Sequence, residues 1–212
     1  DPARGAAMAA AQERSTAIGT KLIFIDLEWA AADDDHVAAI LADPRLDFCR
    51  HHLDNLRLSR PYLLSEAEET IVAEKSQTGF SAWTRLFDEL TSAITVDLPD
   101  EFGGPGRPLM QAASILQHPD RAVRKQVADG ITAGLEPGLR TRAFLFNTLL
   151  LDKSIDDRLR GYPSWISSRN LANEASDESV QALVDAVVDN YSIAQRWYTL
   201  KAQVLGLDRL AD

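Results

Sequence analysis

The spacing of apolar residues constrains the fold of this chain more than any other feature. Over most of the sequence, apolar residues recur every three or four positions. Two examples of this spacing are Leu46, Cys49, Leu53 and Leu56, and Trp83, Leu86, Phe87 and Leu90. A period near 3.6 residues is typical of a helix with one apolar face. The sequence therefore predicts a mainly α, multi-helix structure.

Capping residues indicate where several of these helices begin and end. Ser65 followed by Glu68 has the spacing of a capping box, in which each side chain bonds to the backbone N–H of the other residue. Asp33–Asp35 precede an apolar run and favour a helix N-terminus there. Gly161 can end the preceding helix, because glycine readily adopts the left-handed conformation common just after a helix.

The apolar spacing changes once, between residues 93 and 110. Ile94, Val96 and Leu98 alternate with Thr95 and Asp97, which is the two-residue period of a half-buried strand. The loop-forming stretch DEFGGPGRP follows, and residues 107–110 can return as a second short strand. The sequence therefore predicts one small β-hairpin around residues 93–110.

The charge of the chain excludes several classes of function. Its formal net charge is −10 at pH 7, whereas proteins that bind nucleic acid or membrane surfaces need basic patches. No apolar run approaches the ~18 residues of a membrane-spanning helix. The single cysteine, Cys49, excludes an internal disulfide and is predicted to be a buried small residue. We expect no nucleic-acid or membrane partner, and a cytoplasmic location.

The sequence carries no motif for zinc-dependent hydrolysis. An H-E-x-x-H motif places two histidines one helical turn apart, with a glutamate between them as base. The residues at the decisive positions are Ile40 after His36, Asn55 after His51, Leu56 after His52 and Pro119 directly after His118. We therefore expect no catalytic residue, no metal ligand and no bound zinc in this chain.

One group of carboxylates could in principle carry chemistry. Asp152 and Asp156 lie four residues apart on a predicted helix, next to Asp157, and paired carboxylates can act as acid and base or bind a metal. Lys153 and Arg160 lie among them. We interpret the group as a charged, solvent-exposed helix face.

Three long strings of sequence resemble one known family. Oligoendopeptidase F-like members of the M3 metallopeptidase family have, upstream of their zinc site, a segment similar to DDRLRGYPSWISSRNLANEASDESVQALV (Asp156–Val184). Their N-terminal lobe is similar to LLSEAEETIVAEKSQTGFSAWTRLFDELTSAITVDLP (Leu63–Pro99), and their helical approach to the catalytic region to ALVDAVVDNYSIAQRWYTLKAQVLGLDRL (Ala182–Leu210).

This resemblance implies a peptidase whose chemistry lies outside the chain. In the family, a zinc-activated water hydrolyses short peptides with a glutamate as general base, and upstream helices wall a deep cleft. We expect an N-terminal fragment of such an enzyme, whose parent protein uses zinc and a C-terminal catalytic domain that is missing here. The expected parts are a partial N-terminal helical region (1–60), a lobe with the hairpin (61–160) and helices leading toward the catalytic domain (161–212).

The segment RGYPSWISSRNLANEAS is the best candidate for a substrate-binding surface. Tyr162, Arg169 and Asn170 lie at a predicted helix–helix junction, where an arginine or asparagine can bind the carbonyl or carboxylate groups of a short peptide. The alternative is structural. In that case Tyr162 and Trp165 pack the junction, and Arg169 pairs with an acid such as Glu174.

Other functions remain open at this point. The chain can be a non-catalytic helical scaffold or peptide-binding module, and its net charge alone favours an acidic partner-docking protein. The apolar stripe from Val180 to Tyr191, continued by Trp197, Leu200 and Val204, is wider than one lobe needs to bury. We expect this stripe to be exposed and to favour self-association.

Overall fold

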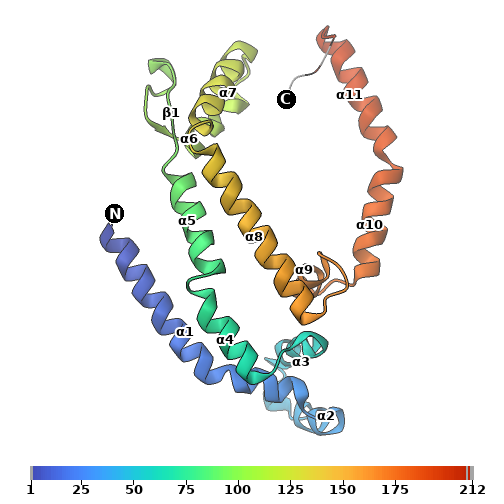
Figure 1. Ribbon diagram of the computed structural model, residues 1–212. Helices are drawn as coiled ribbons and strands as arrows, with labels where there is room; N and C mark the ends of the chain where they lie inside the picture. Colours follow the sequence, from blue (N-terminus) through green and yellow to red (C-terminus); the bar gives the residue numbers. More distant parts are fainter. Residues whose placement is uncertain (1, 209, 211–212) are drawn as a thin grey trace. The chain divides into compact units, whose positions relative to one another are not determined.

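The computed structural model describes residues 2–208 and 210, and it consists mostly of helices (Figure 1). The prediction of a mainly α fold with one small hairpin is confirmed. The chain divides into two compact units, each assembled from segments that are distant in sequence. The first combines the N-terminal segment as far as Ala32 with Leu63–Arg160. The second combines Asp33–Tyr62 with the segment from Gly161 onward.

Pairs of long helices form the frame of the first unit. The first helix runs along the fourth, and the fifth runs along the eighth (Figure 1). Their bounds are α1 (Pro2–Ala31), α4 (Glu66–Ser76), α5 (Phe80–Ser92) and α8 (Leu139–Arg160).

The helix N-termini predicted from the sequence are capped as expected. Ser65 Oγ accepts from the backbone N–H of Glu68, and the Glu68 carboxylate accepts from the backbone N–H of Ser65 at 2.9 Å, which completes the capping box of α4. The carboxylate of Asp33 accepts two backbone N–H bonds at the start of α2 (Asp34–Leu41) in the second unit.

The predicted hairpin is present in the first unit. Strand β1 (Thr95–Val96) pairs antiparallel with β2 (Arg107–Pro108), with Val96 opposite Arg107. Ile94, Val96 and Leu98 are buried, while the side chains of Thr95 and Asp97 between them are exposed. The alternation in the sequence therefore predicts correctly which side chains face the core.

The second strand is shorter than the expected 107–110. Helix α6 (Leu109–Ser114) begins directly after Pro108, and a 3-10 turn (Ile115–Gln117) follows it. Proline has no N–H to continue a strand ladder, but its backbone suits the position before a helix, and Pro108 is the N-cap residue of α6. Another 3-10 turn (Asp100–Phe102) lies within the hairpin loop.

A hydrophobic core cluster of the first unit lies between the hairpin and α7 (Arg121–Leu135). Its buried members are Val96, Leu98, Ala112 and Val127. Two glycines one helical turn apart allow α7 to approach β1 closely. A Cβ atom on Gly134 would lie 2.7 Å from Thr95 O, and one on Gly130 would lie 3.0 Å from Asp97 O.

The second unit is built from shorter elements and two long helices. Its elements after α2 are a 3-10 turn (Pro44–Leu46), α3 (Arg50–Leu58), a 3-10 turn (Arg60–Tyr62), α9 (Ser167–Ala172), α10 (Asp177–Asp189) and α11 (Tyr191–Leu205). Cys49, just before α3, is half-buried rather than buried as predicted, because its Sγ lies 3.4 Å from Leu46 O in a turn near the surface.

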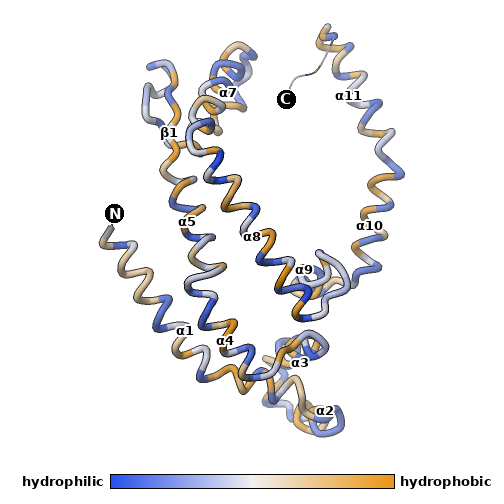
Figure 2. The backbone as a smooth tube through the Cα atoms, in the orientation of Figure 1, coloured by the Kyte–Doolittle hydropathy of each residue, from blue (hydrophilic) through white to orange (hydrophobic). Residues whose placement is uncertain are grey.

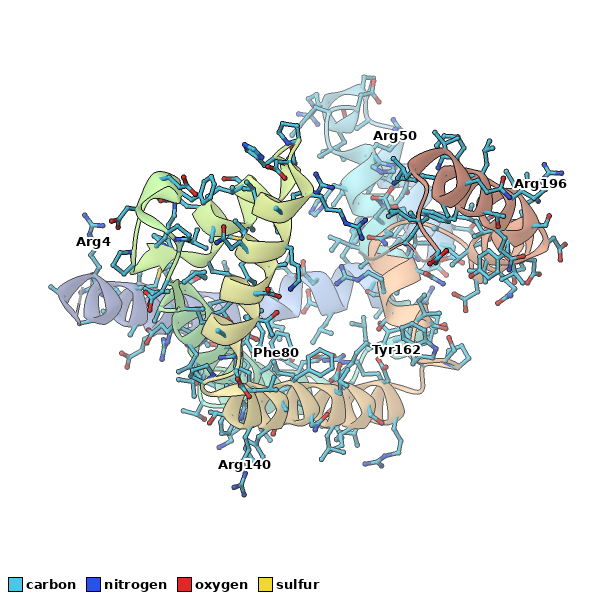
Figure 3. The ribbon with its side chains drawn as sticks, turned by 90° about the horizontal axis from the view of Figure 1, so that it is seen from above. Arg4, Arg50, Phe80, Arg140, Tyr162 and Arg196 are labelled. Carbon is cyan, nitrogen blue, oxygen red and sulfur yellow. The ribbon has the colours of Figure 1, made fainter. Side chains whose placement is uncertain are left out.

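Hydrophobic residues recur along the whole length of helices α10 and α11 (Figure 2). The expected exposure is confirmed for Leu183, Val184, Val187, Val188, Tyr191, Trp197, Leu200 and Val204, which are 46–76% exposed. Val180 is half-buried. Arg196 points away from α11 (Figure 3). Among the described residues, no helix combines the length and the apolar character needed to cross a membrane.

Candidate functional site

The candidate residues lie on the connection between α8 and α10. Gly161 follows α8 with a positive φ of 76°, and the chain then enters the six-residue helix α9. After α9 the chain turns sharply, with Ala175 N–H donating to Asn170 O at 2.9 Å. Glu174 has a φ of 56° within this turn, a conformation that costs a non-glycine residue free energy.

Tyr162 is a packing residue in this structure. Its ring stacks on the ring of Tyr62, with 4.1 Å between centroids and 21° between planes. Both tyrosines belong to the second unit and both are half-buried. Tyr162 is labelled in Figure 3. Tyr162 therefore packs against a neighbouring ring, as the structural alternative expected.

Asn170 is buried and holds the beginning of α10. Asn170 is only 4% exposed, and its Nδ2 donates a hydrogen bond to Asp177 Oδ1 at 2.7 Å. Ser167 Oγ donates to Asp177 Oδ2 at 2.8 Å. These bonds from Asn170 and Ser167 hold the pKa of Asp177 below its usual range. They also place its negative charge at the positive end of the α10 dipole.

Sequence reasoning missed the roles of Ser167 and Asp177. The only available signal was the Ser176–Glu178 stretch, which is typical of a helix start. Ser176 Oγ does accept from the backbone N–H of Ser179 at 3.1 Å. The cross-links from α9 could not be read from that pattern, because they depend on the turn between the two helices.

Arg169 has the properties of an available cation. The residue is exposed, and its side chain makes no hydrogen bond or ion pair with the part of the chain that the structure describes. The proposed pairing of Arg169 with Glu174 is wrong. Glu174 instead contacts His51 Nε2 at 2.8 Å and accepts from Asn55 Nδ2 at 2.5 Å, and these bonds tie α3 to the turn after α9.

Trp165 does not pack the junction as the structural alternative expected, because it is 76% exposed. Its indole instead lines an open groove of about 670 Å³ within the second unit. Asn170 is also in the wall of this groove, whereas Tyr162 and Arg169 are not. The structure therefore does not bring the three candidate residues together into one site.

Two of the three carboxylates of α8 are paired with cations, and the third, Asp152, is exposed as predicted. Asp156 accepts from Arg160 Nε at 3.0 Å, and Asp157 accepts from Lys153 Nζ at 2.5 Å. The predicted solvent-exposed face is wrong for Asp157, which is 8% exposed. Its lysine partner, one helical turn earlier, makes that burial tolerable.

The described residues do not provide a metal site. No three His, Cys, Asp or Glu side chains in residues 2–208 and 210 come together in a way that could hold a metal ion. The zinc that the resemblance implies for the parent enzyme therefore does not fit the residues of this part of the chain.

Known proteins match both the sequence and the fold. A family model described as "Oligopeptidase F" (Peptidase_M3_N) matches residues 28–95. The group B oligopeptidase PepB of Streptococcus agalactiae serotype III (strain NEM316) is 26% identical over 84% of this chain. Oligopeptidase PepF of Bacillus subtilis (strain 168) is 25% identical over 81% of it. The chain is thus similar in sequence to oligopeptidases of the M3 family.

The fold of this chain also has a solved counterpart. The crystal structure of oligoendopeptidase-F from Enterococcus faecium matches 92% of the chain with a TM-score of 0.77 at 21% identity, which shows the likeness of fold. The matches cover 39% of that structure, 30% of PepB and 26% of PepF. The chain thus spans less than a third of the length of PepB and PepF, and about two fifths of the solved chain.

Proposed function

We propose that this chain is the N-terminal lobe of a zinc metallo-oligopeptidase, in which it contributes to the wall and size filter of the peptide cleft. The observation that carries the proposal is the similarity to two oligopeptidases over 84% and 81% of the chain. The zinc ion and its glutamate base would belong to a catalytic domain outside these 212 residues, and that domain would be the principal partner of the lobe.

Arg169 is the residue of this lobe best suited to contact a peptide. Tyr162 and Asn170 are committed to packing and to Asp177, whereas the Arg169 guanidinium is exposed. A guanidinium can donate two parallel hydrogen bonds to a carboxylate, so Arg169 would bind the carboxylate of a short peptide.

The alternative is a peptide-binding module without turnover. The groove beside Trp165 favours it, because this groove is formed within the second unit and requires no further domain. Such a module would use the same fold to hold peptides and would carry no hydrolytic machinery.

The test is the gene sequence downstream of the Asp212 codon, followed by an assay of the full gene product. An H-E-x-x-H motif there, together with zinc-dependent hydrolysis of short peptides, would support the peptidase. A stop codon soon after Asp212 would instead favour the peptide-binding module.

The 212-residue chain alone is expected to contain no stoichiometric zinc and to hydrolyse no peptide. One zinc per chain, measured by elemental analysis after purification without chelator, would contradict the proposal.

A further inference from the structure

The groove beside α10 combines apolar walls with a negative rim. Its walls include Trp165, Ile166 and the aliphatic side chains of α10, and its carboxylates are Asp177, Glu178 and Asp185. None of the residues that line it is a lysine, arginine or histidine. A ligand in this groove therefore meets negative charge without a competing positive group from the lining residues.

Asn170 presents an acceptor to the same groove. Its Nδ2 is used by Asp177, but its carbonyl oxygen Oδ1 makes no hydrogen bond with the described residues. Asn170 is 4% exposed and lines the groove, and its Oδ1 is not among the fully buried atoms that lack a partner, so a donor in the groove can reach it. A donor from a ligand would give this carbonyl oxygen a hydrogen bond that the described residues do not supply.

The spacing of the charges suits a peptide better than a single small cation. Glu178 and Asp185 are seven residues apart on α10, which corresponds to about 10 Å at ~1.5 Å per residue. An extended peptide covers this length in three to four residues at ~3.3 Å each. The exposed indole of Trp165 lies at the same groove and can bind a cation over its face.

We propose that this groove binds a short peptide bearing lysine or arginine side chains. The peptide lies along α10, with its cationic groups at Glu178 and Asp185, one donor at Asn170 Oδ1 and its apolar part against Trp165. The inference rests on the proposed function in that it names the class of peptide.

The test is a binding measurement with the 212-residue chain. The probe is a fluorophore-labelled hexapeptide, acetylated and amidated at its ends, with sequence Ala-Lys-Ala-Ala-Lys-Ala, and its affinity is measured by fluorescence anisotropy at low salt. We expect it to bind about tenfold or more tightly than the same peptide with both lysines replaced by glutamine. Raising the salt concentration should weaken its binding, because exposed charges are screened.

Variants assign the binding to the groove. Glu178→Gln with Asp185→Asn should weaken the lysine peptide about tenfold, as for the loss of one or two charge-assisted contacts. Asp177 is left in place because it holds α9 to α10. The matched control is Glu74→Gln with Asp88→Asn, which removes two exposed acids from the first unit and should leave the affinity unchanged. Trp165→Ala should weaken binding several-fold, and circular dichroism reports whether each variant keeps its helices.

Three outcomes would overturn the proposal. They are equal affinity for the lysine and glutamine peptides, an equal loss in the control variant, and full competition by lysine amide at the same concentration as the peptide. The last would indicate a site for a lone ammonium group. Because the assay requires no hydrolysis, a stop codon after Asp212 would remove the proposed peptidase and leave this result standing. Peptide hydrolysis by the full gene product, without peptide binding in the groove, would support the peptidase and refute the groove proposal.

Discussion

Arg160 donates hydrogen bonds to both carboxylate oxygens of Glu69, 91 positions away in the sequence. Nη1 lies 2.6 Å from Oε1, and Nη2 lies 2.9 Å from Oε2. The two side chains are only 16% and 10% exposed, so this ion pair joins the end of α8 to α4 largely out of water. The hydrogen bond from Arg160 is the main cause of a lowered pKa at Glu69, and that from Glu69 is the main cause of a raised pKa at Arg160.

Removing one member of this pair should destabilise the first unit. Arg160→Met leaves Glu69 with the backbone N–H of Leu64 but without its cation, and the expected loss is about 2–3 kcal/mol in the free energy of unfolding. Urea denaturation measures this loss. The matched control is Arg158→Met on the same helix, where the side chain is exposed and the expected change is within about 0.5 kcal/mol. Equal losses in both variants would show that the ion pair has no special role.

The same pair predicts how stability depends on pH. Glu69 has a folded-state pKa below its ordinary value of 4.5, so its stabilisation is fully present above the unfolded pKa. It is lost as the pH falls from about 5 through the lower folded pKa. In Glu69→Gln, the melting temperature should be lower than in the wild type at pH 7 and should fall less between pH 5 and pH 3. An unchanged acid slope would contradict this assignment, and Glu74→Gln serves as the exposed control.

The close approach of α7 to β1 makes Gly134 sensitive to substitution. In Gly134→Ala the new Cβ would lie 2.7 Å from Thr95 O, so the strand or the helix must move, at an expected cost of about 1–3 kcal/mol. Gly19→Ala in α1 is the control, because nothing lies within 4 Å of its Cβ position. That change should be neutral or stabilise by up to about 1 kcal/mol through helix propensity. Thermal denaturation of the two variants, with shifts of opposite sign expected, tests the packing.

Replacement of Arg169 separates a substrate contact from a packing role. In the full gene product, Arg169→Ala should lower kcat/KM for short peptides about ten- to a hundredfold, as for one charge-assisted contact of about 1.5–3 kcal/mol. The zinc content and the melting temperature should stay unchanged. A lower melting temperature with near-normal kinetics would show that Arg169 acts through structure.

The exposed apolar residues of α10 and α11 predict association of the isolated chain. Leu183 and Trp197 are 65% and 59% exposed, and patches of this kind drive contacts between molecules. Sedimentation velocity should show a mass that rises with protein concentration. Leu183→Ser with Trp197→Ser should shift the chain toward the monomer, whereas Arg196→Ser, a nearby exposed change, should have a smaller effect. A monomer at all concentrations would refute the expectation.

Local features of the fold were predictable because they depend on residues close in sequence. The capping box at Ser65 and the alternation around Val96 are properties of short segments, and both are found as expected. The pairing of Glu174 with His51 was not predictable, because the two are 123 positions apart and meet only through the turn after α9. For the same reason the junction was only partly foreseen: Tyr162 packs, but Trp165 does not.

The core beside the hairpin has a consequence for the order of folding. Its buried members Val96, Leu98, Ala112 and Val127 all fall within a short stretch of the chain, so the loops that must close to join them are small. The contact between Arg160 and Glu69 instead requires the closure of a much longer loop. Closing a short loop costs less conformational entropy than closing a long one. The hairpin and α7 should therefore form first, and α8 should dock later. In pulse-labelling hydrogen exchange, the amides around Val96 should gain protection before those of α4 and the end of α8.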